Sequence, residues 1–345
     1  MMLRRTGGKG RGFARSLRWL SWLVLLWAAG ASAGVAGASP ASAIAASPVT
    51  RLVLDAPAFA PETIKVSVYL PPGYDATSSA RIRYPVLYAN DGQDMAAVGL
   101  QETLNRLYAE HAMRPVIVVA IDMLADRASG YGLSDRQAKR SVVGDSRIGL
   151  IGSKAYAYSD WVATRLVPYV DGHYRTQATR KGRTILGWSL GGLSAFNLGW
   201  QYPDVFGTVG AFSPSFWLAA DRSNAQAVES SRLAQAMVND SNHRRDLRWW
   251  FSVGGREETN DRNGNGVIDA VEDVQDLIGG YRAPDGSHVR GLRDLGYEVD
   301  MDYGDHPSRR AAVAFYLLPD GEHNQATWNR MLPVFLQWAY GTGQP

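Results

Sequence analysis

The 345-residue sequence contains no cysteine. Disulfide bonds and a lipid-modified N-terminal cysteine are therefore excluded, and core packing or a bound metal ion must stabilise the fold. Acidic residues are absent from the first eighteen positions, which hold six of the 36 Lys and Arg residues. The other 30 basic residues are outnumbered by 33 acidic ones, so the rest of the chain has a formal charge of −3. The overall charge of +3 arises from the N-terminal segment and does not indicate nucleic-acid binding.

Charged residues are also absent between Arg18 and Arg51. An apolar run at residues 19–30 follows the basic stretch and has the length of the hydrophobic region of an export signal. Small residues that suit signal cleavage follow at 31–33 and again at 41–43. We therefore expect an exported protein that ends in the periplasm or the medium.

We predict a signal peptide over residues 1–33, with cleavage as late as residue 43, and a flexible leader over residues 34–50. An uncleaved membrane anchor is the alternative. A spanning helix needs about 20 strongly apolar residues, whereas Gly, Ala and Ser predominate here after Trp27. We therefore expect no stable membrane insertion after cleavage.

After the leader, short apolar runs rich in branched residues alternate with segments of helical periodicity. This pattern indicates an α/β fold with a mostly parallel sheet that helices cover on both faces, and the first two strands predict an antiparallel N-terminal edge. Residues 124–154 form a long irregular stretch, which we interpret as a lid or pocket loop. Without an internal repeat, we predict one domain over residues 51–342. The expected strands are residues 50–56, 63–70, 84–90, 114–122, 183–187, 209–213, 247–254, 297–303 and 312–318, and the clearest helices are residues 159–170 and 324–340.

The sequence GWSLG at residues 187–191 matches the G-x-S-x-G pattern, in which a nucleophilic serine occupies a sharp turn from strand to helix. Side chains at the two glycine positions would collide with the neighbouring strand and helix. The turn exposes the Ser189 hydroxyl above the sheet and directs the backbone N–H of Leu190 into the same space. Ser189 as an ordinary helix N-cap is the alternative. The apolar strand before it and the helix after it favour a nucleophile.

A serine hydroxyl needs a base to take its proton, and the chain offers six histidines. This type of turn is found with the chain order serine, acid, histidine, in which the histidine follows the last strand. His323 follows the strand at 312–318 directly and precedes the C-terminal helix. His306 is the alternative, although a further strand lies between it and the end of the chain. We predict His323 as the base.

The acid of such a triad is expected at the end of a strand between the serine and the histidine. The strand at 247–254 leads through two glycines to Glu257 and Glu258. A carboxylate here would fix the imidazole tautomer and stabilise the imidazolium. A solvated glutamate is the simpler interpretation of either residue. We predict Glu257, with Glu258 as the alternative.

A second backbone donor for the oxyanion is expected from the loop after the strand at 84–90. The sequence Asp91-Gly92-Gln93 occupies this loop, where the glycine permits a tight turn. We predict that the N–H of Gln93 joins that of Leu190. An ordinary turn without a function is the alternative.

Six segments of the chain together resemble the putative esterase family of the α/β-hydrolase fold. That family includes feruloyl and acetylxylan esterases, enterochelin-type siderophore esterases, S-formylglutathione hydrolase and mycolyltransferases. The segments cover nearly the whole chain after the leader and occur in the order that the family has. They are VSVYLPPGYD (66–75), YPVLYANDGQD (84–94), LVPYVDGHYRT (166–176), GWSLGGLSAF (187–196), FSPSFW (212–217) and PDGEHNQATWNRMLPVFL (319–336).

The resemblance implies an α/β-hydrolase fold and a serine esterase, with Ser189 as nucleophile and His323 as base. It places Glu257 at the position of the family's acid, where many relatives have Asp. It also implies that Trp217 packs beside the nucleophile and lines the substrate site, and we expect Trp188 to contact the substrate as well.

A further motif, DRNGNGVIDAVE, spans residues 261–272 and matches the D-x-[DN]-x-[DN]-G-x5-E pattern of an EF-hand calcium loop. Oxygen ligands at alternate positions converge on one point, and the last glutamate binds in bidentate fashion. A solvated Asn/Gly loop is the alternative. We predict a structural Ca²⁺ that rigidifies the loop carrying the predicted acid Glu257 and takes the place of a disulfide. The predicted ligands are Asp261, Asn263, Asn265, the carbonyl of Val267, Asp269 through a water, and Glu272.

These features favour an exported serine esterase that hydrolyses a small-molecule or polysaccharide-linked carboxylic ester through an acyl-enzyme. Ca²⁺ is the expected cofactor, with no organic cofactor and no nucleic-acid partner. Acyl transfer to a sugar or lipid alcohol is one alternative, and a non-catalytic, calcium-stabilised binding protein is another. The sequence leaves open the identity of the ester and the oligomeric state.

Overall fold

The computed structural model describes residues 49–241, 246–305, 307–308 and 310–342. The predicted signal peptide and all but the end of the leader lie outside these residues, as does His306. In the part of the chain that the structure describes, no helix has the length and apolar character needed to cross a bilayer.

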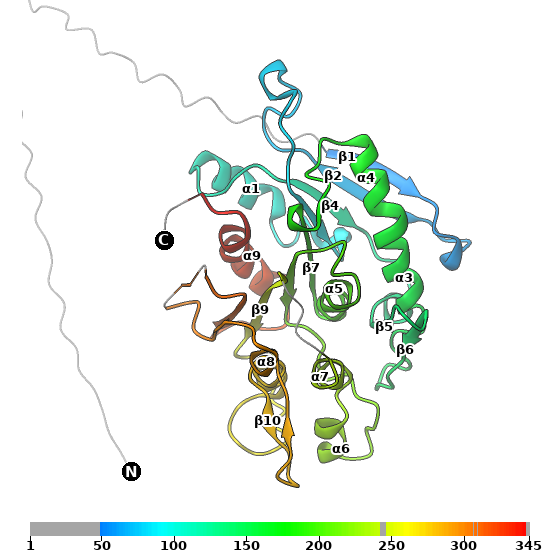
Figure 1. The fold of residues 1–345 in the computed structure, drawn as a ribbon, viewed down its shortest axis with the longest axis vertical. Coiled ribbons are helices and arrows are strands. Elements are labelled where there is room, and N and C mark those ends of the chain that lie inside the picture. The colour runs from blue at the N-terminus through cyan, green and yellow to red at the C-terminus, as the bar shows by residue number, and fades with distance from the viewer. Residues whose placement is uncertain (1–48, 242–245, 306, 309, 343–345) are drawn as a thin grey trace, which may run out of the picture. The chain divides into compact units, whose positions relative to one another are not determined.

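A nine-stranded sheet forms the centre of the described chain, with the order β1-β2-β4-β3-β7-β8-β9-β13-β12 (Figure 1). Strand β2 pairs antiparallel with β1 and β4, and the remaining neighbours pair in parallel. The mostly parallel sheet and its antiparallel N-terminal edge are therefore confirmed. The strands are β1 Val49–Leu54, β2 Ile64–Tyr69, β3 Val86–Ala89, β4 Ile117–Ile121, β7 Arg183–Trp188, β8 Thr208–Phe212, β9 Arg248–Gly254, β12 Val299–Asp300 and β13 Val313–Leu318.

Helices cover both faces of the sheet, as Figure 1 shows. Side chains alternate along each buried strand, so Leu87 and Ala89 pack in one apolar cluster while Val86 and Tyr88 pack in the other. Helices α1 (Leu100–Ala109) and α9 (Gln325–Tyr340) complete the first cluster. The second is completed by α3 Ala155–Trp161, the π-turn Val162–Leu166, α4 Val167–His173, α5 Leu190–Gln201, α7 Leu233–Asn239 and α8 Asp269–Gly279.

Two expectations need adjustment. Residues 297–303 contribute only the two-residue strand β12, because this edge strand pairs with β13 at two positions. The stretch 124–154 is more regular than predicted, because Asn197 on α5 hydrogen-bonds the backbone and hydroxyl of Ser134 and orders a hairpin there. The remaining elements are α2 Arg127–Gly130, β5 Leu133–Asp135, β6 Arg140–Val142, α6 Ala225–Ser230, β10 Tyr281–Arg282, β11 His288–Val289 and the short 3₁₀ turns Pro57–Phe59, Thr77–Ser79, Gly92–Asp94, Arg180–Gly182 and Arg293–Leu295.

The carboxyl ends of the parallel strands lie at one edge of the sheet, where α/β proteins place their ligands. Asp91 follows β3, Ser189 follows β7 and Ser213 follows β8. Glu257 and His323 follow β9 and β13, which are neighbours in the sheet. The topology therefore brings the predicted site residues to this one edge.

Candidate active site

Ser189 occupies a strained turn between β7 and α5. Its backbone angles are φ 55° and ψ −126°, a conformation that costs a non-glycine residue of order 1–3 kcal/mol. A Cβ on Gly187 would lie 2.1 Å from the carbonyl oxygen of Gly191, and one on Gly191 would lie 2.2 Å from a carboxylate oxygen of Asp91. Both glycines are therefore required by close packing, and the Ser189 side chain makes no capping hydrogen bond to α5.

Glu257 and His323 form a direct pair. The Nδ1 atom of His323 lies 2.8 Å from Oε2 of Glu257, and the carboxylate is 2% exposed while the imidazole is 40% exposed. The second oxygen of Glu257 accepts hydrogen bonds from the backbone N–H of Gly254 at 2.6 Å and from the Ser213 hydroxyl at 2.5 Å. Glu258 instead hydrogen-bonds Asn260. Of the two predicted candidates, Glu257 is the carboxylate that contacts the histidine.

Backbone contacts between the loops after β9 and β13 hold this pair together. The N–H of Arg256 donates to the carbonyl of Gly321 at 2.8 Å, and a Cβ on Gly254 would lie 2.4 Å from the same oxygen. Helix α9 begins immediately after His323, with the Asn324 side chain accepting from the backbone N–H of Thr327 at 3.0 Å. His323 therefore lies directly before the capped N-terminus of a helix.

Ser213 and Trp328 join the pair to the core, and the sequence patterns did not single out either one. The indole N–H of Trp328 donates to the Ser213 hydroxyl at 2.9 Å, and the hydroxyl donates on to Glu257. The Trp328 ring also meets the His323 ring edge-on at 5.4 Å. One signal was present in the sequence, since Ser213 directly follows the buried strand β8 at the same edge.

The loop after β3 is fixed by a buried ion pair. Asp91 lies in the left-handed region at φ 56° and binds Arg127 through both carboxylate oxygens, at 2.7 and 2.9 Å. Burial raises the pKa of Asp91 above its ordinary value, and Arg127 opposes this shift. Arg127 also donates to the carbonyl of Trp188 at 3.1 Å, which ties this loop to the turn at Ser189.

The two predicted oxyanion donors lie at the starts of helical turns. Leu190 is the first residue of α5, where backbone N–H groups lack partners within the helix. Gln93 lies in the turn Gly92–Asp94, and its side chain donates to Asp91 at 3.2 Å and accepts from the N–H of Met123 at 3.0 Å. These contacts hold the backbone of Gln93 beside the buried ion pair.

The two predicted substrate-contacting tryptophans differ in their surroundings. Trp188 is 1% exposed, stacks on Trp328 at 5.5 Å and donates to Asp94 at 3.1 Å, so the structure places it in the core and the expectation of substrate contact is corrected. Its position in β7 turns its side chain into the cluster beneath α9. Trp217 is partly buried and lines a cavity, with the Arg222 guanidinium 5.6 Å above its ring.

That cavity has a volume of about 620 Å³ and adjoins the loop that carries Glu257. Residues after β8 form one wall, and the 146–148 segment forms another. The third wall comes from the predicted calcium loop and the residues just before it. The lining residues on these walls include Trp217, Arg222, Arg147, Glu258, Asn260 and Asp261.

The loop at 261–272 brings together some of its predicted ligands. The side chains of Asn263 and Asn265 both contact Oε1 of Glu272, at 2.7 and 2.5 Å. The carboxylate of Asp269 is directed to Arg262 instead, with one oxygen 3.2 Å from the guanidinium. Among the described residues, no group of three or more His, Asp or Glu side chains is placed so that it could hold a metal ion by itself. A cation here would depend on amide and carbonyl oxygens as well.

The sheet order and the strained serine turn define an α/β-hydrolase. The model of the putative esterase family matches residues 58–278, so the chain belongs to that family and is a hydrolase that acts on ester bonds. An uncharacterised Bacillus subtilis protein, YjcH, is 26% identical over 217 residues, which cover 63% of this chain and 77% of that protein. An endo-1,4-β-xylanase/feruloyl esterase of Xylanibacter ruminicola is 27% identical over 47% of this chain and 21% of its own length.

Solved structures confirm the fold. A ferulic acid esterase matches 85% of this chain and 98% of its own, with a TM-score of 0.57 and 19% identity. The enterobactin esterase of Shigella flexneri matches 85% of this chain and 58% of its own, with a TM-score of 0.58 and 17% identity. At these identities the likeness concerns the fold.

Proposed function

We propose that this protein is an exported serine esterase in which Ser189, His323 and Glu257 act as the catalytic triad. The observation that carries the proposal is the 2.8 Å contact between His323 and Glu257 at the sheet edge where the strained Ser189 turn also lies. Membership of an esterase family supports the same reaction class.

In this mechanism the Ser189 hydroxyl attacks the ester carbonyl while Nε2 of His323 takes its proton. Glu257 faces Nδ1, which fixes the tautomer and leaves Nε2 on the other side of the ring. The oxyanion accepts hydrogen bonds from the backbone N–H groups of Leu190 and Gln93. His323 then returns the proton to the departing alcohol, and the same imidazole activates the water that hydrolyses the acyl-enzyme.

The proposed substrate is a small-molecule or polysaccharide-linked carboxylic ester. Structural relatives named for ferulic acid and enterobactin esters support this class. Trp217 and the adjoining cavity, whose lining includes both arginines and carboxylates, offer an aromatic and charged surface to one side of the ester. An ester panel of feruloyl, acetyl-sugar, trilactone and thioester compounds, run with added alcohol acceptors, identifies the substrate and separates hydrolysis from acyl transfer.

Export is proposed from the basic stretch and apolar run over residues 1–33. Mass spectrometry of the protein from cell fractions tests it, and a full-length chain confined to the cytoplasm would contradict it. Ca²⁺, proposed for the loop at 261–272, has a structural role in this scheme and takes part in no chemical step.

The nucleophile is tested with Ser189→Ala and a short p-nitrophenyl ester. We expect turnover to fall by about 10⁴-fold or more, with an unchanged circular dichroism spectrum and melting temperature. Ser194→Ala is a matched control, because Ser194 is a buried serine on α5, the helix that follows Ser189. Turnover by Ser189→Ala at the level of the unmodified protein would reject the proposal.

A further inference from the structure

The loop at residues 261–272 is wound around the carboxylate of Asp261. One oxygen of Asp261 accepts the backbone N–H groups of Gly264 at 2.8 Å and Asn265 at 3.1 Å, and the other accepts that of Gly266 at 2.8 Å. Both glycines lie in the left-handed region, at φ 73° and 87°. The chain therefore turns tightly enough to direct successive side chains to one point.

Glu272 supplies a second and independent observation. It is 9% exposed and lies in the first turn of α8, where Asn263 and Asn265 contact its Oε1 atom. Its Oε2 atom is buried and has no hydrogen-bond partner. A buried carboxylate oxygen without a partner is costly, and a bound cation would satisfy it. The two amides donate to Oε1 of Glu272, while their oxygens accept the backbone N–H groups of Asn265 and Val267. A cation would therefore displace the amide nitrogens from Glu272.

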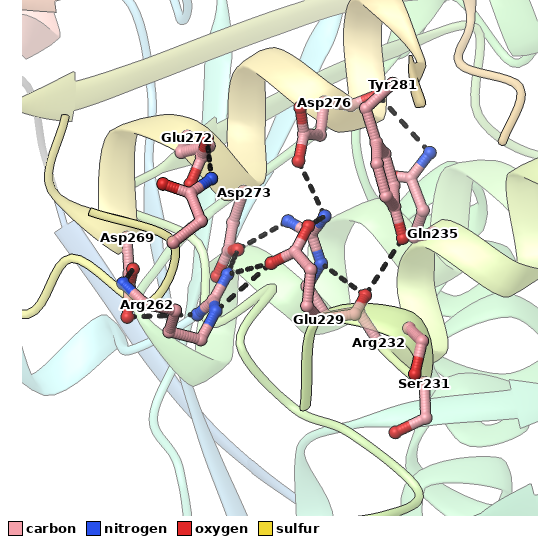
Figure 2. A network of polar contacts seen from close by, with 12 residues as sticks. Glu229, Ser231, Arg232, Gln235, Arg262, Asp269, Glu272, Asp273, Asp276 and Tyr281 are labelled. Atoms are coloured by element: carbon pink, nitrogen blue, oxygen red, sulfur yellow. Dashed lines mark hydrogen bonds and ion pairs between the residues drawn. The ribbon is translucent and has the colours of Figure 1, made fainter. Parts of the chain in front are cut away.

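The charges behind the loop also favour a bound cation. Figure 2 shows the guanidinium groups of Arg232 and Arg262 among the carboxylates of Glu229, Asp269, Asp273 and Asp276. Arg232 contacts Glu229, Asp273 and Asp276 at 2.5–2.6 Å, and Arg262 contacts Glu229, Asp269 and Asp273. This buried network therefore has two more negative than positive groups, before Asp261 and Glu272 are counted. A divalent cation at the loop would offset that excess.

We propose that the loop binds one Ca²⁺ ion. The ligands are the side-chain oxygens of Asp261, Asn263 and Asn265, the carbonyl of Val267 and both carboxylate oxygens of Glu272. Asp269 is held by Arg262 and completes the shell through a water. Ca²⁺ accepts six to eight oxygen ligands in a flexible arrangement, whereas Mg²⁺ requires a near-ideal octahedron. The Ca²⁺ site goes beyond the proposed esterase function, because none of its ligands belongs to the proposed triad.

The ion would hold one wall of the cavity. The N–H of Asp269 donates to the carbonyl of Asn260 at 2.9 Å and closes the base of the loop. Asn260, Asp261 and Asp269 all line the cavity. Glu257 is fixed separately by Ser213 and Gly254. If the proposed esterase function holds, removal of Ca²⁺ therefore raises KM more than it lowers kcat.

The full chain, freed of metal with a chelator and dialysed, is titrated with Ca²⁺ by calorimetry and by thermal unfolding. We expect one ion per chain with a Kd between about 10⁻⁵ and 10⁻³ M. A hundredfold excess over Kd raises Tm by about 5 °C. Mg²⁺ at the same concentration shifts Tm much less.

Glu272→Gln weakens Ca²⁺ binding at least about tenfold, because a charged bidentate ligand is lost. Asp285→Asn is the control, since it also replaces a carboxylate by an amide but lies in an exposed turn outside the loop. Asp261→Asn, expected to weaken binding as well, replaces Glu272→Gln if that variant does not fold.

Absence of binding heat and of a Tm shift at about 10 mM Ca²⁺, roughly ten times the weakest expected Kd, would overturn the site. Unchanged affinity in a folded Glu272→Gln variant would overturn the ligand assignment. The esterase proposal fails separately: a chain that binds Ca²⁺ but turns over no ester supports the ion site alone. If the enzyme is active and its KM is the same with and without Ca²⁺, the proposed effect of the ion on the cavity wall is wrong.

Discussion

Two loops at the carboxyl edge of the sheet each hold a charged residue in place, and they do so in different ways. The loop after β3 is fixed by one buried pair, Asp91 with Arg127, whose charges balance. The longer loop after β9 leads from Glu257 into a buried network in which carboxylates outnumber guanidinium groups. A chain without disulfides can thus order one loop with its own residues alone. For the other loop, we propose a bound cation.

The largest difference between the two loops is expected in kcat, when Glu257, the proposed acid, is replaced. Glu257→Gln keeps the size of the side chain but favours the wrong imidazole tautomer, so we expect kcat to fall by about 10³–10⁴-fold. Glu258→Gln is the matched control and should change kcat less than about threefold. Steady-state kinetics on one ester measures both. Equal losses in the two variants would contradict the assignment of Glu257.

The network behind the second loop holds more negative than positive groups. We therefore expect the loss of a positive charge to lower the free energy of unfolding more than the loss of a negative one. Arg232→Met leaves three buried carboxylates without their shared partner, and we expect the free energy of unfolding to fall by about 3–5 kcal/mol. Asp276→Asn removes one of the excess charges and should cost less than about 1 kcal/mol. Urea unfolding at pH 7 measures both variants, and a larger loss for Asp276→Asn would contradict the account.

The same carboxylate predicts a pH dependence. Burial raises the pKa of Asp276 to about 6 although Arg232 opposes the shift. The folded state therefore binds this proton more tightly than the unfolded state, and stability falls as pH rises from about 4 to 6. The Asp276→Asn variant should lack the part of this stability loss that Asp276 causes. Urea unfolding at several pH values across the same range measures it. An identical pH profile in the variant would contradict the prediction.

The loop after β3, whose charges balance, should lose stability when its arginine is replaced. Arg127→Met leaves the Asp91 carboxylate buried and unpaired, and we expect a loss of about 2–3 kcal/mol, reduced by the partial exposure of Arg127. The pKa of Asp91, already raised by burial, should rise further. The variant should then lose additional stability as pH rises above about 4, because the unfolded state there releases the proton that the folded state still holds. A pH-independent loss would contradict this.

The smallest effect is expected at Ser213. Ser213→Ala removes one of the three hydrogen bonds to Glu257 and the acceptor of the Trp328 indole. We expect kcat to fall about tenfold with KM nearly unchanged, since a hydrogen bond to a charged group contributes about 1.5–3 kcal/mol and the others remain. Ser215→Ala, a buried serine in the same loop, is the control. A change in KM alone would show that Ser213 does not position Glu257.

Much of the fold was predictable because each strand is a short apolar run between polar turns. All nine strands of the sheet coincide with predicted segments, and β12 is merely shorter. The places of two candidate residues in the fold were also predictable: that of Ser189 at the turn after β7 from a local pattern, and that of His323 after β13 from chain order.

Residues that act through distant partners were not predictable. Asp91 meets Arg127 across 36 positions, and Ser213 meets Glu257 across 44, so no local pattern reveals either contact. The choice between Glu257 and Glu258 depended on which side chain turns toward the histidine. Trp188 was expected to contact the substrate, whereas alternation along β7 directs its side chain into the core.

The central claim is that the hydroxyl of Ser189 is activated by His323, and a fluorophosphonate probe tests it most directly. Intact-mass and peptide mass spectrometry should find one label per chain, attached to Ser189, and His323→Ala should slow labelling by at least about a hundredfold. A label on another residue, or equal labelling rates in the unmodified chain and in His323→Ala, would contradict the account.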